Sequence, residues 1–151
     1  MALPAYLNFT SNIRTHAMFV GVMLTLDAIV TLLIRAAWNV KPEDLPKELQ
    51  HVAHLKDVIL GVGIVNAVFA IVFWVGFLKR QRWCLTVFIG FLAVAITLQF
   101  IGLLGAMLQL NFVSACAMLI VLGINGYVLL VTLQLRKVNS DFTLSQDGFS
   151  A

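Results

Sequence analysis

Residues 17–34 read AMFVGVMLTLDAIVTLLI, an apolar run that is interrupted near its middle by one ionisable residue, Asp27. About 20 consecutive apolar residues are enough for a helix to cross the hydrocarbon core of a bilayer. A charged side chain at the bilayer centre costs at least about 2.5–3.5 kcal/mol on insertion scales, so such residues usually face a partner, a cavity or a pathway. The run therefore predicts a membrane span that contains an acid with a specific role.

The composition of the 151-residue chain indicates that this span is one of several. The chain is 61% hydrophobic and 11% charged, with a mean hydropathy of +0.97. Soluble domains are nearer to about 45–50% apolar and about 25% charged. The net charge of +3 comes from basic residues at the ends of the spans, where membrane topology explains them. We therefore expect the lipid bilayer as a partner and no nucleic acid.

Four long apolar segments predict an all-α membrane protein, an antiparallel bundle of four transmembrane helices. The spans are expected at about 15–34, 58–78, 84–108 and 112–135, within one domain of residues 1–137. Only Gln109, Leu110 and Asn111 separate the last two spans, which predicts a tight hairpin. The polar segment 138–151 predicts a flexible cytoplasmic tail.

The first loop between spans has a helical pattern of its own. Leu45, Leu49 and Val52 fall on one face at helical spacing. The other face carries Asp44, Lys47, Glu48, His51 and His54. This pattern predicts an amphipathic helix at the membrane interface, or alternatively a helix that continues into the second span. His51 and His54 are weak candidates for metal ligands, because two histidines beside one carboxylate occur often by chance. We therefore predict no metal and no cofactor.

The distribution of basic residues predicts the orientation of the chain. Six lysines and arginines lie on the side of the termini and four on the other side, which favours cytoplasmic termini in an inner or plasma membrane. On the side of the termini, five of these residues are also predicted to bind lipid head groups and fix the topology: Lys79, Arg80, Arg82, Arg136 and Lys137.

Each span carries one polar side chain in its interior, namely Asp27, Asn66, Gln99 and Asn125. At about 1.5 Å per helical residue, the four lie within roughly 8 Å of one another along the membrane normal. One hypothesis is a packing lock, in which hydrogen bonds between these groups fix the helix register. The alternative is that Asp27 binds and releases a proton or a cation. A third possibility is that Asp27 faces a polar group of a partner subunit.

The sequence contains no motif for catalysis, phosphate binding or zinc binding, so we do not expect an enzyme. Aromatic residues form several helix faces that are suited to contacts with other subunits: Phe69, Phe73, Trp74 and Phe77, then Phe88 and Phe91. The first functional hypothesis is a non-enzymatic accessory, assembly or scaffold subunit of a larger membrane complex. The alternative is a small proton- or cation-coupled transporter or channel that acts as a homo-oligomer through Asp27.

Overall fold

The computed structural model describes residues 12–37, 47 and 55–149, and nearly all of these residues are helical. There are four α-helices in this part of the chain: α1 (Ile13–Ala37), α2 (Leu55–Leu78), α3 (Arg82–Leu108) and α4 (Phe112–Phe149). All four are long and apolar enough to cross a membrane. The prediction of four helices with the length and apolar composition of membrane spans is confirmed, as expected of a small integral membrane protein.

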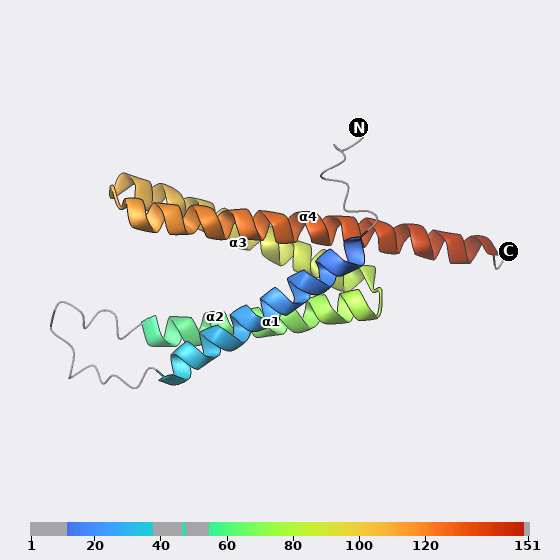
Figure 1. Cartoon of the computed structure of the whole chain (residues 1–151), viewed down its shortest axis with the longest axis horizontal. Helices are drawn as coiled ribbons and strands as arrows, with labels where there is room; N and C mark the ends of the chain where they lie inside the picture. Colours follow the sequence, from blue (N-terminus) through green and yellow to red (C-terminus); the bar gives the residue numbers. More distant parts are fainter. Residues whose placement is uncertain (1–11, 38–46, 48–54, 150–151) are drawn as a thin grey trace.

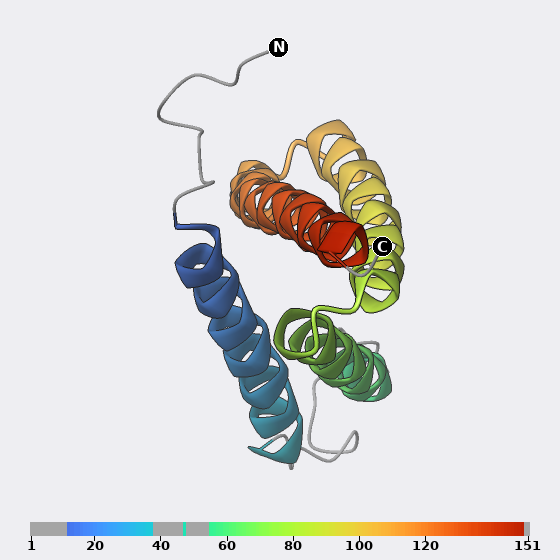
Figure 2. The same cartoon turned by 90° about the vertical axis from the view of Figure 1, so that its right-hand side faces the viewer.

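The helices form two pairs that lean apart, as Figure 1 shows. Helix α1 packs along α2, and α3 packs along α4. The two pairs meet where α1 begins, α2 ends and α3 begins, which we call the closed end. They diverge toward the turn between α3 and α4 and the last residues of α1, which we call the open end. The molecule is therefore a bundle of four helices that is splayed at one end, and Figure 2 shows the two helix pairs from the side of the closed end.

The main hydrophobic core lies near the closed end and joins all four helices. Its largest fully buried side chains are Phe73, Leu85 and Phe88, and Val20 and Val131 complete it from α1 and α4. The aromatic residues of α2 and α3 were expected to face partner subunits, and for Phe73 and Phe88 this was wrong. These two rings pack against each other inside the bundle, with centroids 5.2 Å apart, an arrangement in which aromatic rings attract each other in addition to filling space.

Close contacts of small residues hold α1 against α2. A Cβ atom added to Gly21 would lie 2.8 Å from Cζ2 of Trp74, and one added to Gly63 would lie 2.9 Å from Cδ2 of Leu32. Both distances are too short for a real Cβ contact. Glycine at these two positions lets the helix backbones approach, as is usual in membrane bundles.

The turn between α3 and α4 satisfies the backbone groups at both helix ends. The N–H of Asn111 donates to the carbonyl of Ala106, and the N–H of Leu110 donates to that of Met107. This pair of bonds is a Schellman motif, with Leu110 at the left-handed position (φ 53°). The side chain of Asn111 accepts the N–H of Ser114 at 3.2 Å and caps the start of α4. The three-residue connection is thus built by Asn111 and the last turn of α3.

Helix α4 continues well past the apolar span, to Phe149. Residues 138–151 were expected to be a flexible tail, but the backbone of 138–149 is helical. The reason is local, because residues 136–147 contain neither proline nor glycine, so nothing in this segment breaks the helix begun in the span. The predicted interfacial helix, with His51 and His54, lies outside the described residues apart from Lys47 and the beginning of α2.

Candidate functional site

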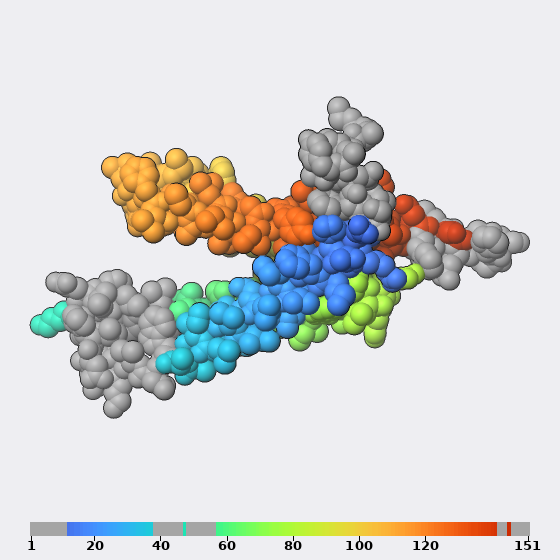
Figure 3. Space-filling view, viewed as in Figure 1, coloured from blue at the N-terminus to red at the C-terminus, as the bar shows by residue number. Residues whose placement is uncertain are grey.

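A cleft of about 750 Å³ lies between the two helix pairs and receives side chains from all four helices. Figure 3 shows the separation of the two pairs toward the open end. Helix α2 lines the cleft from Phe69 to Val58, which lies in its first turn and therefore close to the open end. The four interior polar residues predicted from the sequence, Asp27, Asn66, Gln99 and Asn125, all line this cleft.

The first wall of the cleft carries a hydrogen-bonded pair from α1 and α2. Nδ2 of Asn66 donates to Oδ2 of Asp27 at 2.8 Å. The side chain of Asp27 is exposed and that of Asn66 is half-buried. Thr31, one turn further along α1, donates its hydroxyl to the backbone carbonyl of Asp27 at 2.8 Å. The close approach of α1 to α2 at Gly63, one turn from Asn66, brings the two side chains within reach.

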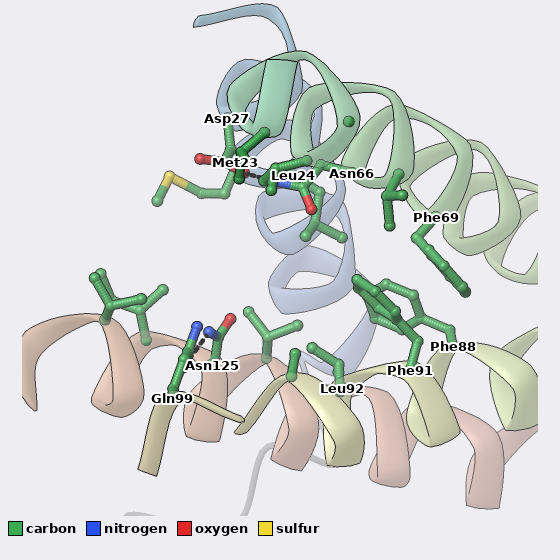
Figure 4. A pocket seen from close by; sticks show the side chains of 18 residues that line it. Met23, Leu24, Asp27, Asn66, Phe69, Phe88, Phe91, Leu92, Gln99 and Asn125 are labelled. Carbon is green, nitrogen blue, oxygen red and sulfur yellow. Dashed lines mark hydrogen bonds between the residues drawn. The ribbon is translucent and has the colours of Figure 1, made fainter. Parts of the chain in front are cut away.

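The opposite wall carries a second pair, from α3 and α4. Nδ2 of Asn125 donates to Oε1 of Gln99 at 2.9 Å, and both side chains are half-buried. Figure 4 shows this pair across the cleft from Asp27 and Asn66. Among the described residues, no hydrogen bond joins one pair to the other. The four polar side chains therefore form two separate hydrogen-bonded pairs that face the same cleft. They do not form one continuous hydrogen-bonded network.

Aromatic side chains form the part of the cleft nearest the closed end. The rings of Phe69 and Phe91 are stacked, with centroids 3.7 Å apart and planes 10° apart. Figure 4 shows them at one end of the cleft, with the two polar pairs at the other. The cleft thus changes character along its length, from aromatic near the core to polar toward the open end.

Two further contacts between spans were not predicted from the sequence. Nδ1 of His16 lies 2.7 Å from the hydroxyl of Tyr127 and joins α1 to α4 near the closed end. Nε1 of Trp74 donates to the hydroxyl of Thr25 at 2.9 Å and joins α2 to α1. The only sequence signal for the second contact is the pair Gly21 and Thr25, one turn apart on α1. Such a pair shows that a helix face is suited to close packing, but does not identify the tryptophan that fills it.

The predicted head-group anchors lie toward the closed end and do not line the cleft. Lys79, Arg80 and Arg82 are exposed at the connection between α2 and α3, and on α4 Arg136 is half-buried and Lys137 exposed. Asp27 makes no ion pair with any described residue, since every described lysine and arginine lies outside the middle of the apolar spans. Binding of lipid head groups by the five basic residues stays a prediction.

Within 12–37, 47 and 55–149, no three histidine, cysteine or acidic side chains are grouped so that they could hold a metal ion. Both cysteines are free, Cys84 buried and Cys116 exposed. Comparison of the chain with protein-family models, with curated proteins and with solved structures finds no match. The cleft and the residues that line it are therefore the features of the described chain that indicate a function.

Proposed function

We propose that this chain is a small membrane transporter that moves a cation, or couples transport to one, with Asp27 as the cation-binding group. The observation that carries the proposal is the exposed carboxyl group of Asp27 in a cleft that is closed at one end and splayed at the other. A transporter that alternates access needs a site of this kind, which is reached from one side while a packed core blocks the other.

The arrangement of the four polar residues favours this proposal over a packing lock. A lock would join Asp27, Asn66, Gln99 and Asn125 across the bundle and leave no space between them. The two pairs instead lie on opposite walls of a cleft of about 750 Å³. A carboxyl group that faces such a space inside a membrane is a group that can receive a ligand.

We propose that the four spans cross the membrane in antiparallel fashion, with both termini in the cytoplasm, as the distribution of lysine and arginine favours. The open end, with Asn111, then faces the opposite side of the membrane. The predicted interfacial helix of residues 45–56 belongs to that same side.

The test is cation flux in vesicles that contain the purified protein. Asp27→Asn removes the charge but keeps the size and the ability to accept a hydrogen bond from Asn66. We expect this variant to lose at least about 90% of the flux, because an amide does not bind a proton or a cation in the way a carboxylate does. Asp57→Asn is the matched control, because Asp57 is an exposed acid at the start of α2 that does not line the cleft. Equal flux in wild type and Asp27→Asn would contradict the proposal.

A second proposed function is that of a non-enzymatic accessory, assembly or scaffold subunit. The observation in its favour is that the cleft of the single chain is open, with Asp27 exposed and the other polar groups only half-buried, so that a transmembrane segment of another subunit, or of a second copy, would cover them. This proposal predicts that a tagged chain purifies in mild detergent with stoichiometric amounts of other membrane subunits. A monodisperse single protein that transports a cation on its own would contradict it.

A further inference from the structure

We infer that the ligand of the cleft is a hydrophobic organic cation, a molecule with a single positive charge and apolar or aromatic substituents. The inference rests on the proposed transport function, because it names the class of substrate for the same site. It comes from three features of the cleft, namely its charge, the chemistry of its walls and its volume.

The charge of the cleft is a single negative group. Of the eighteen described residues that line it, Asp27 alone is ionisable. Its Oδ2 atom accepts the hydrogen bond from Asn66, whereas Oδ1 accepts none from any described residue. A carboxylate with a free oxygen, in a cleft whose apolar walls focus its field, favours a positively charged ligand. Asn66 holds the carboxyl group in place and is a positioning residue for the ligand.

The walls of the cleft are suited to an organic surface. Apart from Asp27, Asn66, Gln99 and Asn125, the lining residues are apolar, and Phe69 and Phe91 place aromatic carbon at the inner end. Aromatic rings bury a large apolar area and also attract organic cations. The volume of about 750 Å³ lies within the range of roughly 300–1,000 Å³ that is usual for small-molecule sites.

The same walls are poorly suited to a small inorganic cation. A hard cation that has lost its water needs about six or more oxygen ligands at close range. Asp27 and Asn66 stand on one wall and Gln99 and Asn125 on the other, and Oε1 of Gln99 already accepts a hydrogen bond from Asn125. The apolar side chains between them offer no further ligands, whereas they do offer contact area to an organic molecule.

The test is equilibrium binding to the detergent-purified full chain with two ions of nearly identical shape and opposite charge. Tetraphenylphosphonium is the cationic probe and tetraphenylborate the anionic one. We expect saturable binding of the cation with one site per chain and no saturable binding of the anion. Asp27→Asn should weaken cation binding by at least about tenfold, which corresponds to about 1.4 kcal/mol. Asp57→Asn should bind the cation as the wild type does.

A second pair of variants tests the location of the ligand without altering any charge. Gly61 lines the cleft and Gly90 does not, and a Cβ atom added at either position meets nothing within 4 Å. Gly61→Leu should therefore place a side chain in the cleft without disturbing the fold and weaken binding, while Gly90→Leu should have no effect. Retention of the wild-type helical circular dichroism and gel-filtration profile shows that each variant is folded.

The outcomes separate this inference from the proposed function. Equal binding of both probes, or cation binding that is unchanged in Asp27→Asn and Gly61→Leu, would overturn the inference. Asp27-dependent flux of protons or alkali cations without saturable tetraphenylphosphonium binding would likewise overturn it, while transport would stand. Selective binding of tetraphenylphosphonium without any Asp27-dependent flux would support the ligand class and refute transport.

Discussion

At the scale of single residues, the contact of Gly21 with Trp74 shows how α1 is held against α2. The indole ring lies so close to Gly21 that an added Cβ atom would be 2.8 Å from Cζ2. The ring is not free to move away, because its Nε1 donates to the hydroxyl of Thr25, which in turn donates to the carbonyl of Gly21. Gly21, Thr25 and Trp74 therefore form one packed unit near the closed end.

This unit predicts that Gly21→Ala destabilises the protein. The added methyl group displaces the indole ring and strains its hydrogen bond, and overpacking of this kind costs about 1–3 kcal/mol. Gly123→Ala is the matched control, since a Cβ atom at Gly123 meets nothing within 4 Å. Unfolding in a titration with a denaturing detergent, followed by loss of helical circular dichroism, measures the difference. A Gly21→Ala protein as stable as the Gly123→Ala protein would show that the close contact does not hold α1 in place.

The sequence predicted the four polar residues that line the cleft but not how they pair. Counting residues from the ends of the spans places Asp27, Asn66, Gln99 and Asn125 at similar depth, and the structure brings all four to one cleft. Depth does not determine which helices are neighbours or how far apart they stand. The pairing of Asp27 with Asn66 depends on the close approach of α1 to α2, and the separation of the two pairs depends on the splay of the bundle.

At the scale of the elements, the two connections that follow α2 and α3 each use a backbone conformation that residues with side chains rarely adopt. Arg80, between α2 and α3, has φ of 54°, and Leu110, between α3 and α4, has φ of 53°. This left-handed region costs a residue with a Cβ atom about 1–2 kcal/mol, a cost that glycine avoids. Leu110 is also 73% exposed, so its side chain contributes little packing in return.

We therefore expect Leu110→Gly to stabilise the connection between α3 and α4. The free energy gained by relieving the left-handed backbone strain exceeds the entropic cost of ordering a glycine. We therefore expect the free energy of unfolding to rise by about 0.5–1 kcal/mol. Leu110→Ala keeps the Cβ atom and should give no gain. The midpoints of thermal unfolding of the two variants in the same detergent provide the comparison. If glycine and alanine have the same effect, the strain at Leu110 does not limit stability.

The positions of the four helices followed from the sequence because long apolar runs and their charged ends are local signals. The connection between α3 and α4 was predicted at the residues where it occurs, Gln109 to Asn111. The end of α4 was not predicted, because polar composition suggested a tail without structure. Residues 136–147 contain no helix breaker, and the helix continues to Phe149. For this segment, the absence of proline and glycine predicts the helix better than the polar composition does.

At the scale of the whole molecule, the splay of the two helix pairs opens the cleft between them. The core around Phe73, Leu85 and Phe88 closes one end, and the pairs separate toward the other. The hydropathy of the sequence does not predict the splay of the bundle. The splay arises from contacts between residues far apart in the chain, such as His16 with Tyr127. For the same reason the sequence pattern did not reveal that Phe73 and Phe88 face the interior.

The proposed transport site requires that water reaches Asp27 from one side of the membrane only, through the open end. Cysteine accessibility tests this requirement, since a thiol reacts as the thiolate, which forms in water and not in lipid. The Asp27→Cys substitution is made in a chain in which Cys84 and Cys116 are replaced by alanine. Ile29→Cys is the control, because Ile29 lies on the same helix, is exposed and does not line the cleft, so that we expect it to face lipid.

A membrane-impermeant thiol reagent is then added to sealed vesicles from each side in turn. We predict that the Asp27→Cys protein is modified only from the side on which Asn111 and the open end lie, and that the Ile29→Cys protein is modified from neither side. Modification of the Asp27→Cys protein only from the side of the closed end, or equal resistance of both variants from both sides, would contradict a cleft that opens to one side.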